Sequence, residues 1–294
     1  MDLEFFKKIC YTHSELITRK YSTSFSFATS LMEKEKRKAI YAIYGFVRLA
    51  DEIVDSFHGY DKQFLLDTLQ KDLAYALENK ISINPILLAF ADTVAQCNIP
   101  AEHIEAFMES MRCDLTKTTY TSENEIGEYI YGSANVVGLM CLKVFCNGED
   151  KLYKHLKKPA ESLGSAFQKV NFLRDLNFDL NELGRTYFPE LQQGAFNHEN
   201  KALIQQSIEH DFRLAYEGIR QLPGKSKLAV LIAYYYYNAL FKKIKKCHPD
   251  EILNQRIRIS NLKKYLIIMK VYCLFKLKLI WDGITIWSIP NTLF

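Results

Sequence analysis

Apolar residues recur at three- and four-residue spacing through most of this chain, and this periodicity limits the fold more than any other feature. Residues typical of helix starts occur at several points along the chain. Asn84 stands before Pro85, Ser122 and Glu125 form a capping box, and 248–253 reads "HPDEIL". Glycine (12) and proline (7) are scarce, and no long alternating pattern indicates a strand. We therefore expect an all-α fold of about ten helices.

The same scarcity of turn residues, without any linker-like segment, predicts one domain over residues 1–281, followed by a tail, 282–294, to which no role is assigned. A net charge of +4 with no long basic run argues against a nucleic-acid partner. The seven cysteines form no CxxC pair, and the first residues lack the apolar core of a signal peptide. These features predict a cytoplasmic protein with reduced thiols.

The C-terminal stretch 261–281 is apolar, but lysines at 263, 264, 270, 276 and 278 interrupt it. A transmembrane helix tolerates few such charges. Two interpretations stay open: a last bundle helix with a basic outer edge, or an interfacial helix that gives peripheral contact with the inner face of a membrane.

A first acid-rich stretch reads "RLADEIVD" at 48–55. On a helix, Asp51 and Asp55 share one face with Tyr44 and Arg48, amid apolar neighbours. Two carboxylates at this spacing repel each other, so a cation is expected to compensate them. Glu52 points to another side of the same helix.

A second stretch, "QKVNFLRDLNFD" at 168–179, has the same design. Gln168, Asn171, Asp175 and Asp179 form one polar stripe on a helix. If the two stripes face each other across a cavity, divalent cations such as Mg²⁺ can bridge them and bind a diphosphate. The alternative is two exposed faces whose carboxylates pair with Arg48 and Arg174.

At these residues the chain resembles the head-to-head trans-isoprenyl diphosphate synthases, the phytoene and squalene synthases. "DEIVD" and "DLNFD" resemble the family's two aspartate-rich motifs. The likeness, over residues 15–275, extends to "YSTSF", "MRCDL", "YIYGSANVVGLM" and "NFLRDLNFDLNELGRTYFP". Asn135 stands where the family usually has glycine, so we expect the local packing there to differ.

The resemblance implies the class I isoprenoid synthase fold, a helical bundle around a central active-site cavity. It implies that Mg²⁺, with Mn²⁺ as an alternative, is held by Asp51, Asp55, Asn171, Asp175 and Asp179, and that no nicotinamide is needed. The four aspartates and Tyr44 are the expected catalytic residues. Substrate binding is expected from Ser22, Ser24, Phe25, Arg48, Tyr129, Gln168, Asn171, Arg174, Arg185 and Tyr187.

The implied reaction joins two identical allylic prenyl diphosphates through a cyclopropyl diphosphate. Its cations need an apolar, π-rich wall, for which Phe25, Tyr41, Tyr44 and Tyr129 are candidates, whereas the tyrosines at 234–237 are interpreted as core packing. The overall likeness implies a phytoene synthase acting on geranylgeranyl diphosphate, and the small Thr29, one turn past Phe25, agrees with a deep tunnel. The alternatives are a dehydrosqualene or squalene synthase acting on farnesyl diphosphate and, more remotely, a non-catalytic assembly or binding factor.

Overall fold

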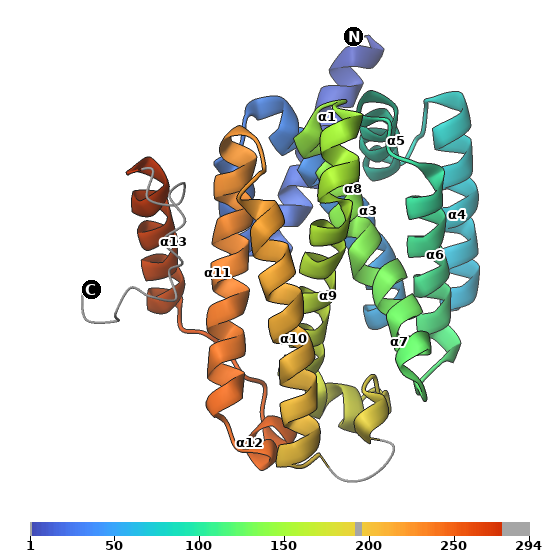
Figure 1. Cartoon of the computed structure of the whole chain (residues 1–294). Helices are drawn as coiled ribbons and strands as arrows, with labels where there is room; N and C mark the ends of the chain where they lie inside the picture. The colour runs from blue at the N-terminus through green and yellow to red at the C-terminus, as the bar shows by residue number, and fades with distance from the viewer. Residues whose placement is uncertain (1, 192–195, 278–294) are drawn as a thin grey trace.

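The computed structural model describes residues 2–191 and 196–277, which form a bundle of α-helices (Figure 1). Within these residues there is no β-strand, only an isolated bridge between Thr119 and Thr186. The all-α prediction is confirmed. In chain order the elements are α1 (Leu3–Tyr21), α2 (Thr23–Ser30), α3 (Lys34–Ser56), α4 (Lys62–Asn79), α5 (Pro85–Cys97), α6 (Ala101–Thr116), α7 (Glu123–Ile130), the π-helix η1 (Tyr131–Asn135), α8 (Val136–Cys146), α9 (Asp150–Asn181), the 3₁₀-helix η2 (Pro189–Leu191), α10 (His198–Ile219), α11 (Gly224–Lys246), α12 (Pro249–Asn254) and α13 (Asn261–Lys276).

The predicted helix starts are found where the sequence places them. The Asn84 side chain accepts hydrogen bonds from the amides of Ile86 and Leu87, with Pro85 in the first turn of α5. Ser122 caps α7 by accepting from the amide of Glu125 at 3.2 Å. His248 caps α12, which begins at Pro249. The described residues hold thirteen α-helices rather than about ten, because the chain also forms short ones such as α2, α7 and α12.

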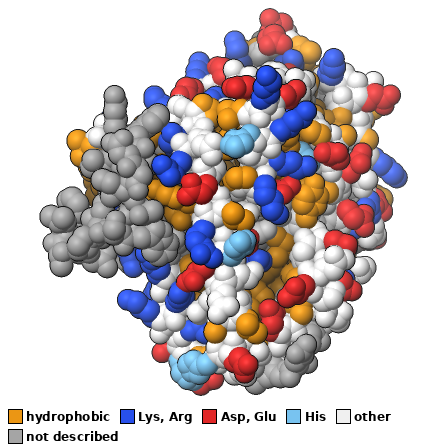
Figure 2. All heavy atoms as spheres, in the orientation of Figure 1, with side chains coloured by type: hydrophobic (Ala, Val, Ile, Leu, Met, Phe, Trp, Pro, Cys, Tyr) orange, Lys and Arg blue, Asp and Glu red, His pale blue; other side chains and the backbone are white. Residues whose placement is uncertain are grey.

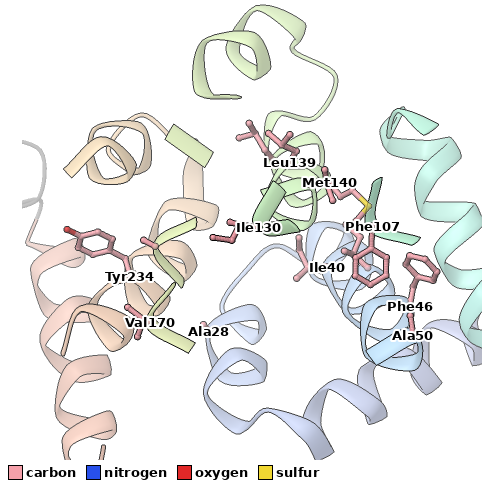
Figure 3. Close-up of a cluster of buried hydrophobic side chains, with 14 of the residues drawn as sticks. Ala28, Ile40, Phe46, Ala50, Phe107, Ile130, Leu139, Met140, Val170 and Tyr234 are labelled. Carbon is pink, nitrogen blue, oxygen red and sulfur yellow. The ribbon is translucent and has the colours of Figure 1, made fainter. Parts of the chain in front are cut away.

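One core cluster runs through α3, α5, α6, α8, α9, α10 and α11, and three of its aromatic rings meet between α3, α5 and α6. Figure 3 shows Phe46 of α3 and Phe107 of α6 pointing toward each other, with ring centroids 5.4 Å apart. Phe46 also stacks on Phe90 of α5 at 4.1 Å. Burying three aromatic side chains together contributes several kcal/mol, on the order of 2 kcal/mol for each ring.

The helices that carry the two acid-rich stretches, α3 and α9, both pack against α8. The 32-residue α9 also packs along α10, and it contains Pro159. A Cβ on Gly218 of α10 would lie 2.2 Å from the Cβ of Pro159, so only glycine allows the two helices to approach this closely.

Asn135 is accommodated by a glycine on the opposite helix. Its Oδ1 accepts a hydrogen bond from the Ser165 hydroxyl at 3.1 Å, and a Cβ on Gly164 would lie 2.8 Å from the same oxygen. The space for the larger side chain therefore comes from Gly164, next to the π-helical turn that Asn135 ends.

One continuous run, Glu123–Cys146, is long and apolar enough by composition to cross a membrane. It comprises α7, η1 and α8, and 61% of its most apolar window is buried inside the protein, as in the core helix of a folded bundle. The predicted tail, 282–294, lies outside the described residues, as do the last residues of the predicted domain.

Candidate active site

The first acid-rich stretch lies on α3, and its two aspartates have different surroundings. Asp51 lines a cavity, whereas the Asp55 side chain is 50% exposed and lies 3.6 Å from the guanidinium of Arg185. Burial, and then the negative charge of Asp55, raise the pKa of Asp51 to about 7. Asp51 forms no ion pair with any described residue, so its charge is left for a cation to compensate.

Arg48 does not pair with the aspartates of its own helix. Its guanidinium donates a hydrogen bond to Glu52 and lies over the ring of Tyr21, 4.4 Å from the centroid. The positive charge still lowers the pKa of Asp51, but less than burial raises it. Glu52 is therefore the direct ion-pair partner of Arg48, which is four residues before it on the same helix.

The second stretch lies on α9, where Asp175 and Asp179 are also one turn apart. Asp175 is held between two guanidiniums, 2.5 Å from Arg174 and 2.6 Å from Arg256. Asp179 is buried and forms no ion pair with the described residues. Burial, and then the charge of Asp175, raise the pKa of Asp179 to about 7.

Arg185 connects the two stretches. It approaches Asp55, donates to the backbone carbonyl of Asp114 at 2.7 Å, and donates to the Tyr187 hydroxyl at 3.4 Å. Its own amide donates to the Asp179 carbonyl at 2.7 Å. The loop after α9 is therefore tied to α3, α6 and α9, and it brings the two acidic groups together.

A fifth carboxyl group, Asp114 of α6, belongs to the same cluster. Its Oδ2 accepts a hydrogen bond from Tyr129 at 3.0 Å, and its buried Oδ1 has no partner among the described residues. Burial raises the pKa of Asp114 to about 6. Asp114 lies in the "MRCDL" stretch, a motif that could have pointed to it, but it was not among the predicted site residues.

Of these five carboxylates, Asp51 lines a cavity of about 360 Å³. Asp51, Gln168 and Asn171 contribute its polar groups, and Tyr237 donates a hydrogen bond to Asn171 at 3.2 Å. Mostly apolar residues from α2, α3, η1, α8, α9, α10 and α11 form the rest of the wall, and many are small: Ala28, Thr29, Ala134, Gly138, Ala160, Gly164, Ala215, Gly218, Ala229 and Ala233. The site thus joins an acidic group to a long apolar space.

Two of the four side chains predicted for the aromatic wall line the cavity, and two do not. Phe25 and Tyr44 line the cavity and stack on each other at 5.0 Å. Tyr41 does not line it and is buried in the core, with its hydroxyl donating to the Ser26 carbonyl. Tyr129 also lies outside the lining, where its ring contacts the rings of Phe172 and Tyr187, which stack on each other at 4.0 Å. Tyr237, interpreted as core packing, does line the cavity and stacks on Phe167 at 3.9 Å.

The remaining predicted residues lie around the same end. Ser22 caps α2 by accepting from the amide of Phe25, and Ser24 is half-buried in the first turn of that helix. Arg256, which was not among the predicted site residues, comes from the segment between α12 and α13. Within residues 2–191 and 196–277, no three acidic, histidine or cysteine side chains lie close enough to hold a metal ion by themselves.

Known proteins resemble this chain over nearly its whole length. Residues 18–263 match the squalene/phytoene synthase family. A phytoene synthase of Arthrospira platensis is 29% identical over 273 residues, covering 84% of this chain and 87% of the relative. Phytoene synthase 3 of Zea mays is 28% identical, covering 87% of this chain, which spans 64% of the maize protein.

Solved structures show the same fold. A dehydrosqualene synthase in complex with a ligand superimposes with a TM-score of 0.77 at 21% identity, covering 92% of this chain and 98% of the other. A squalene synthase from Alicyclobacillus acidocaldarius gives 0.73 at 23% identity, with 84% and 96% covered. Together with the family match over residues 18–263, these likenesses show that the chain belongs to the squalene/phytoene synthase family, whose members are enzymes that transfer prenyl groups.

Proposed function

We propose that this chain is a phytoene synthase that joins two geranylgeranyl diphosphates head to head in carotenoid biosynthesis and acts in the cytoplasm. The observation that carries the proposal is that the Asp51 carboxylate lines an otherwise mainly apolar cavity of about 360 Å³. A prenyl diphosphate has the same polarity, a charged head on a long hydrocarbon chain. Relatives named phytoene synthase, at 26–29% identity, support the choice of reaction.

The residues present fit a Mg²⁺ site. Asp51 and Asp179 are poorly solvated carboxylates without an ion pair among the described residues, and oxygen is the ligand that Mg²⁺ prefers. Asp55, Asp175 and Asn171 would supply further oxygens. Because the protein offers no complete set of ligands, diphosphate and water oxygens would fill the remaining positions. When bound, Mg²⁺ (or Mn²⁺) would neutralise the diphosphate and make it a leaving group.

Cationic and hydroxyl groups around the carboxylates would orient the diphosphates. Arg174, Arg185 and Arg256 each carry a planar guanidinium that would bind phosphate oxygens through two parallel hydrogen bonds. Ser22, Ser24, Gln168 and Tyr187 would add neutral donors. Arg48, already paired with Glu52, would act by its charge.

The apolar side chains that line the cavity would surround the carbocations formed during the reaction. Ionisation of one substrate leaves an allylic cation, which the double bond of the second attacks, and loss of a proton closes the cyclopropyl diphosphate. A second ionisation, rearrangement and proton loss give the linear product. Phe25, Tyr44 and Tyr237 would stabilise positive charge through their ring faces while the apolar wall excludes water.

To test this proposal, purified protein is incubated with Mg²⁺ and without nicotinamide, in parallel with geranylgeranyl diphosphate or farnesyl diphosphate, and the product is identified. A forty-carbon product from the first substrate alone is the expected result. A thirty-carbon product from farnesyl diphosphate, or an intermediate that accumulates until NADPH is added, would assign the chain to the squalene branch. No product from either would favour a non-catalytic factor of the same fold.

A further inference from the structure

The outward face of α13 is apolar and exposed. It consists of Leu262, Tyr265, Leu266, Met269, Tyr272 and Leu277, each between 38% and 70% exposed. These residues fall on one side of the helix because their spacing follows its turn. The opposite side, which includes the buried Val271, packs on α11, and Figure 1 shows α13 at the outer edge of the bundle.

Lysines border this apolar face, and α13 contains no acidic residue. Lys263 and Lys270 follow one edge, about 80–100° around the helix from Leu262, and neither forms an ion pair with a described residue. Tyr265 and Tyr272 follow the other edge. Lys276, in the last turn, falls within the face about 40° from Leu262, and its ammonium lies 5.7 Å from the Tyr272 ring centroid. A tyrosine edge and a lysine edge around an apolar stripe are typical of helices that lie in a membrane interface.

The lysine edge opens onto a basic groove between α10, α11 and α13. Besides Lys263 and Lys270, the groove is lined by Arg213, Lys242 and Lys246, with Glu209 as its acidic residue. Glu209 is already paired with Lys245. Positive charge is crowded here, because burial and then the charges of Lys270 and Lys263 lower the pKa of Lys242. Figure 2 shows blue side chains gathered on this part of the surface.

We propose that α13 docks this enzyme on an anionic lipid bilayer, with the apolar face at the level of the headgroups and Lys263, Lys270 and the groove against lipid phosphates. Charge complementarity favours a membrane over a second copy of the chain. A symmetric dimer through this face would offer these lysines no carboxylate, because α13 contains no acidic residue, and in its antiparallel form it would place basic edge against basic edge. The inference stands whether the substrate carries fifteen or twenty carbons.

The test measures partition of the full-length protein onto vesicles of phosphatidylcholine, alone or mixed with phosphatidylserine. We expect strong binding only to the mixed vesicles, weakened by added salt. The double variant Leu266→Glu/Met269→Glu should lose binding at least tenfold, because it puts charge into the apolar face. Lys263→Gln/Lys270→Gln should lose about fivefold for each lysine removed, and only on the anionic vesicles.

Matched variants on other surfaces control for solubility and net charge. Phe64→Glu/Tyr75→Glu alters two exposed residues of α4, on the opposite side of the bundle from α13 (Figure 1), and should bind as the unaltered protein does. Lys151→Gln/Lys154→Gln removes the same charge from the exposed side of α9 and should have little effect. Circular dichroism checks that every variant is folded.

Three results would overturn the proposal. The first is no binding to either kind of vesicle. The second is equal binding by the α13 variants and the unaltered protein, which would place the contact elsewhere, the segment 278–294 included. The third is a dimer in light scattering that Leu266→Glu/Met269→Glu converts to a monomer without changing vesicle binding, which would assign the face to a second copy.

Discussion

The guanidinium of Arg185 lies 3.6 Å from the carboxylate of Asp55, so the loop that follows the second acid-rich stretch reaches back to the first. Arg185 also donates to the Asp114 carbonyl on α6. Arg185 thus contacts α3 and α6 through its side chain and the end of α9 through its backbone amide. Under the proposed function, its guanidinium would bind a diphosphate between the two acid-rich stretches.

Arg185→Gln is therefore expected to impair diphosphate binding. We predict that KM for the allylic diphosphate rises at least tenfold, about 1.4 kcal/mol of binding, because a charge-assisted bidentate contact is lost. Steady-state kinetics measures this. Arg19→Gln removes an exposed guanidinium paired with Glu15 on α1 and serves as the control. Unchanged kinetics in a folded Arg185→Gln protein would remove Arg185 from the site.

Asp179→Asn should stabilise the protein while it disables the enzyme. The carboxylate is buried without an ion pair among the described residues, so replacing it by a neutral amide of the same shape should raise stability by roughly 1–2 kcal/mol in EDTA at pH 8. Thermal unfolding and product assays measure the two effects. Asp150→Asn, exposed and paired with Lys143, should change neither. A stability loss, or full activity, would contradict the assignment.

Thr29 should limit substrate length, because it lines the cavity beside Phe25 and is itself buried. A phenylalanine at 29 would fill part of the apolar space, so Thr29→Phe is expected to lower kcat/KM for geranylgeranyl diphosphate much more than for farnesyl diphosphate. Thr29→Val, of nearly equal volume, should leave that ratio unchanged. Equal losses on both substrates would mean that position 29 does not face the end of the chain.

Gly218→Ala should be destabilising because the new Cβ would collide with Pro159. Separating α9 and α10 in a packed interior is expected to cost about 1–3 kcal/mol. Gly127→Ala provides the matched change, since a Cβ at that position of α7 meets nothing within 4 Å. That variant should be neutral or stabilising by up to about 1 kcal/mol. Denaturant melts compare them, and equal stabilities would contradict the close approach.

Stability should fall in acid through His103. This imidazole is fully buried, its Nε2 lies 2.8 Å from the Tyr153 hydroxyl, and burial lowers its pKa. Because the unfolded chain binds the proton more readily, stability is lost as pH falls from about 6.5 through the lowered pKa. His103→Gln should reduce this slope in thermal melts between pH 7.5 and 5 relative to the exposed-site control His210→Gln. An unchanged slope would mean that His103 titrates normally.

The periodic apolar pattern was sufficient to predict the helical bundle, and the caps at Asn84, Ser122 and His248 placed helix starts correctly. These features are local, because each depends on residues within one turn of the helix. The pairing of Asp51 with Asp55 and of Asp175 with Asp179 was equally readable. Their spacing of four residues determines that they share a face.

Contacts between distant segments could not be read in this way. Arg256 lies 81 positions from the Asp175 carboxylate that it binds, and it comes from a segment with no helical pattern. Tyr237 sits in a run of four tyrosines, and only the packing of α11 decides which of them lines the cavity. Tyr41 and Tyr129 were proposed for the wall from their chemistry, and the packing places both outside the cavity lining.

The most direct measurement is the affinity of a thiodiphosphate analogue of geranylgeranyl diphosphate, which binds but does not ionise, determined by calorimetry with Mg²⁺ and with EDTA. If the carboxylates beside the cavity hold diphosphate through the metal, affinity should be at least tenfold higher with Mg²⁺. Asp179→Asn should lose most of that gain. Equal affinity in EDTA, or an unaltered gain in Asp179→Asn, would contradict a metal–diphosphate site at these carboxylates.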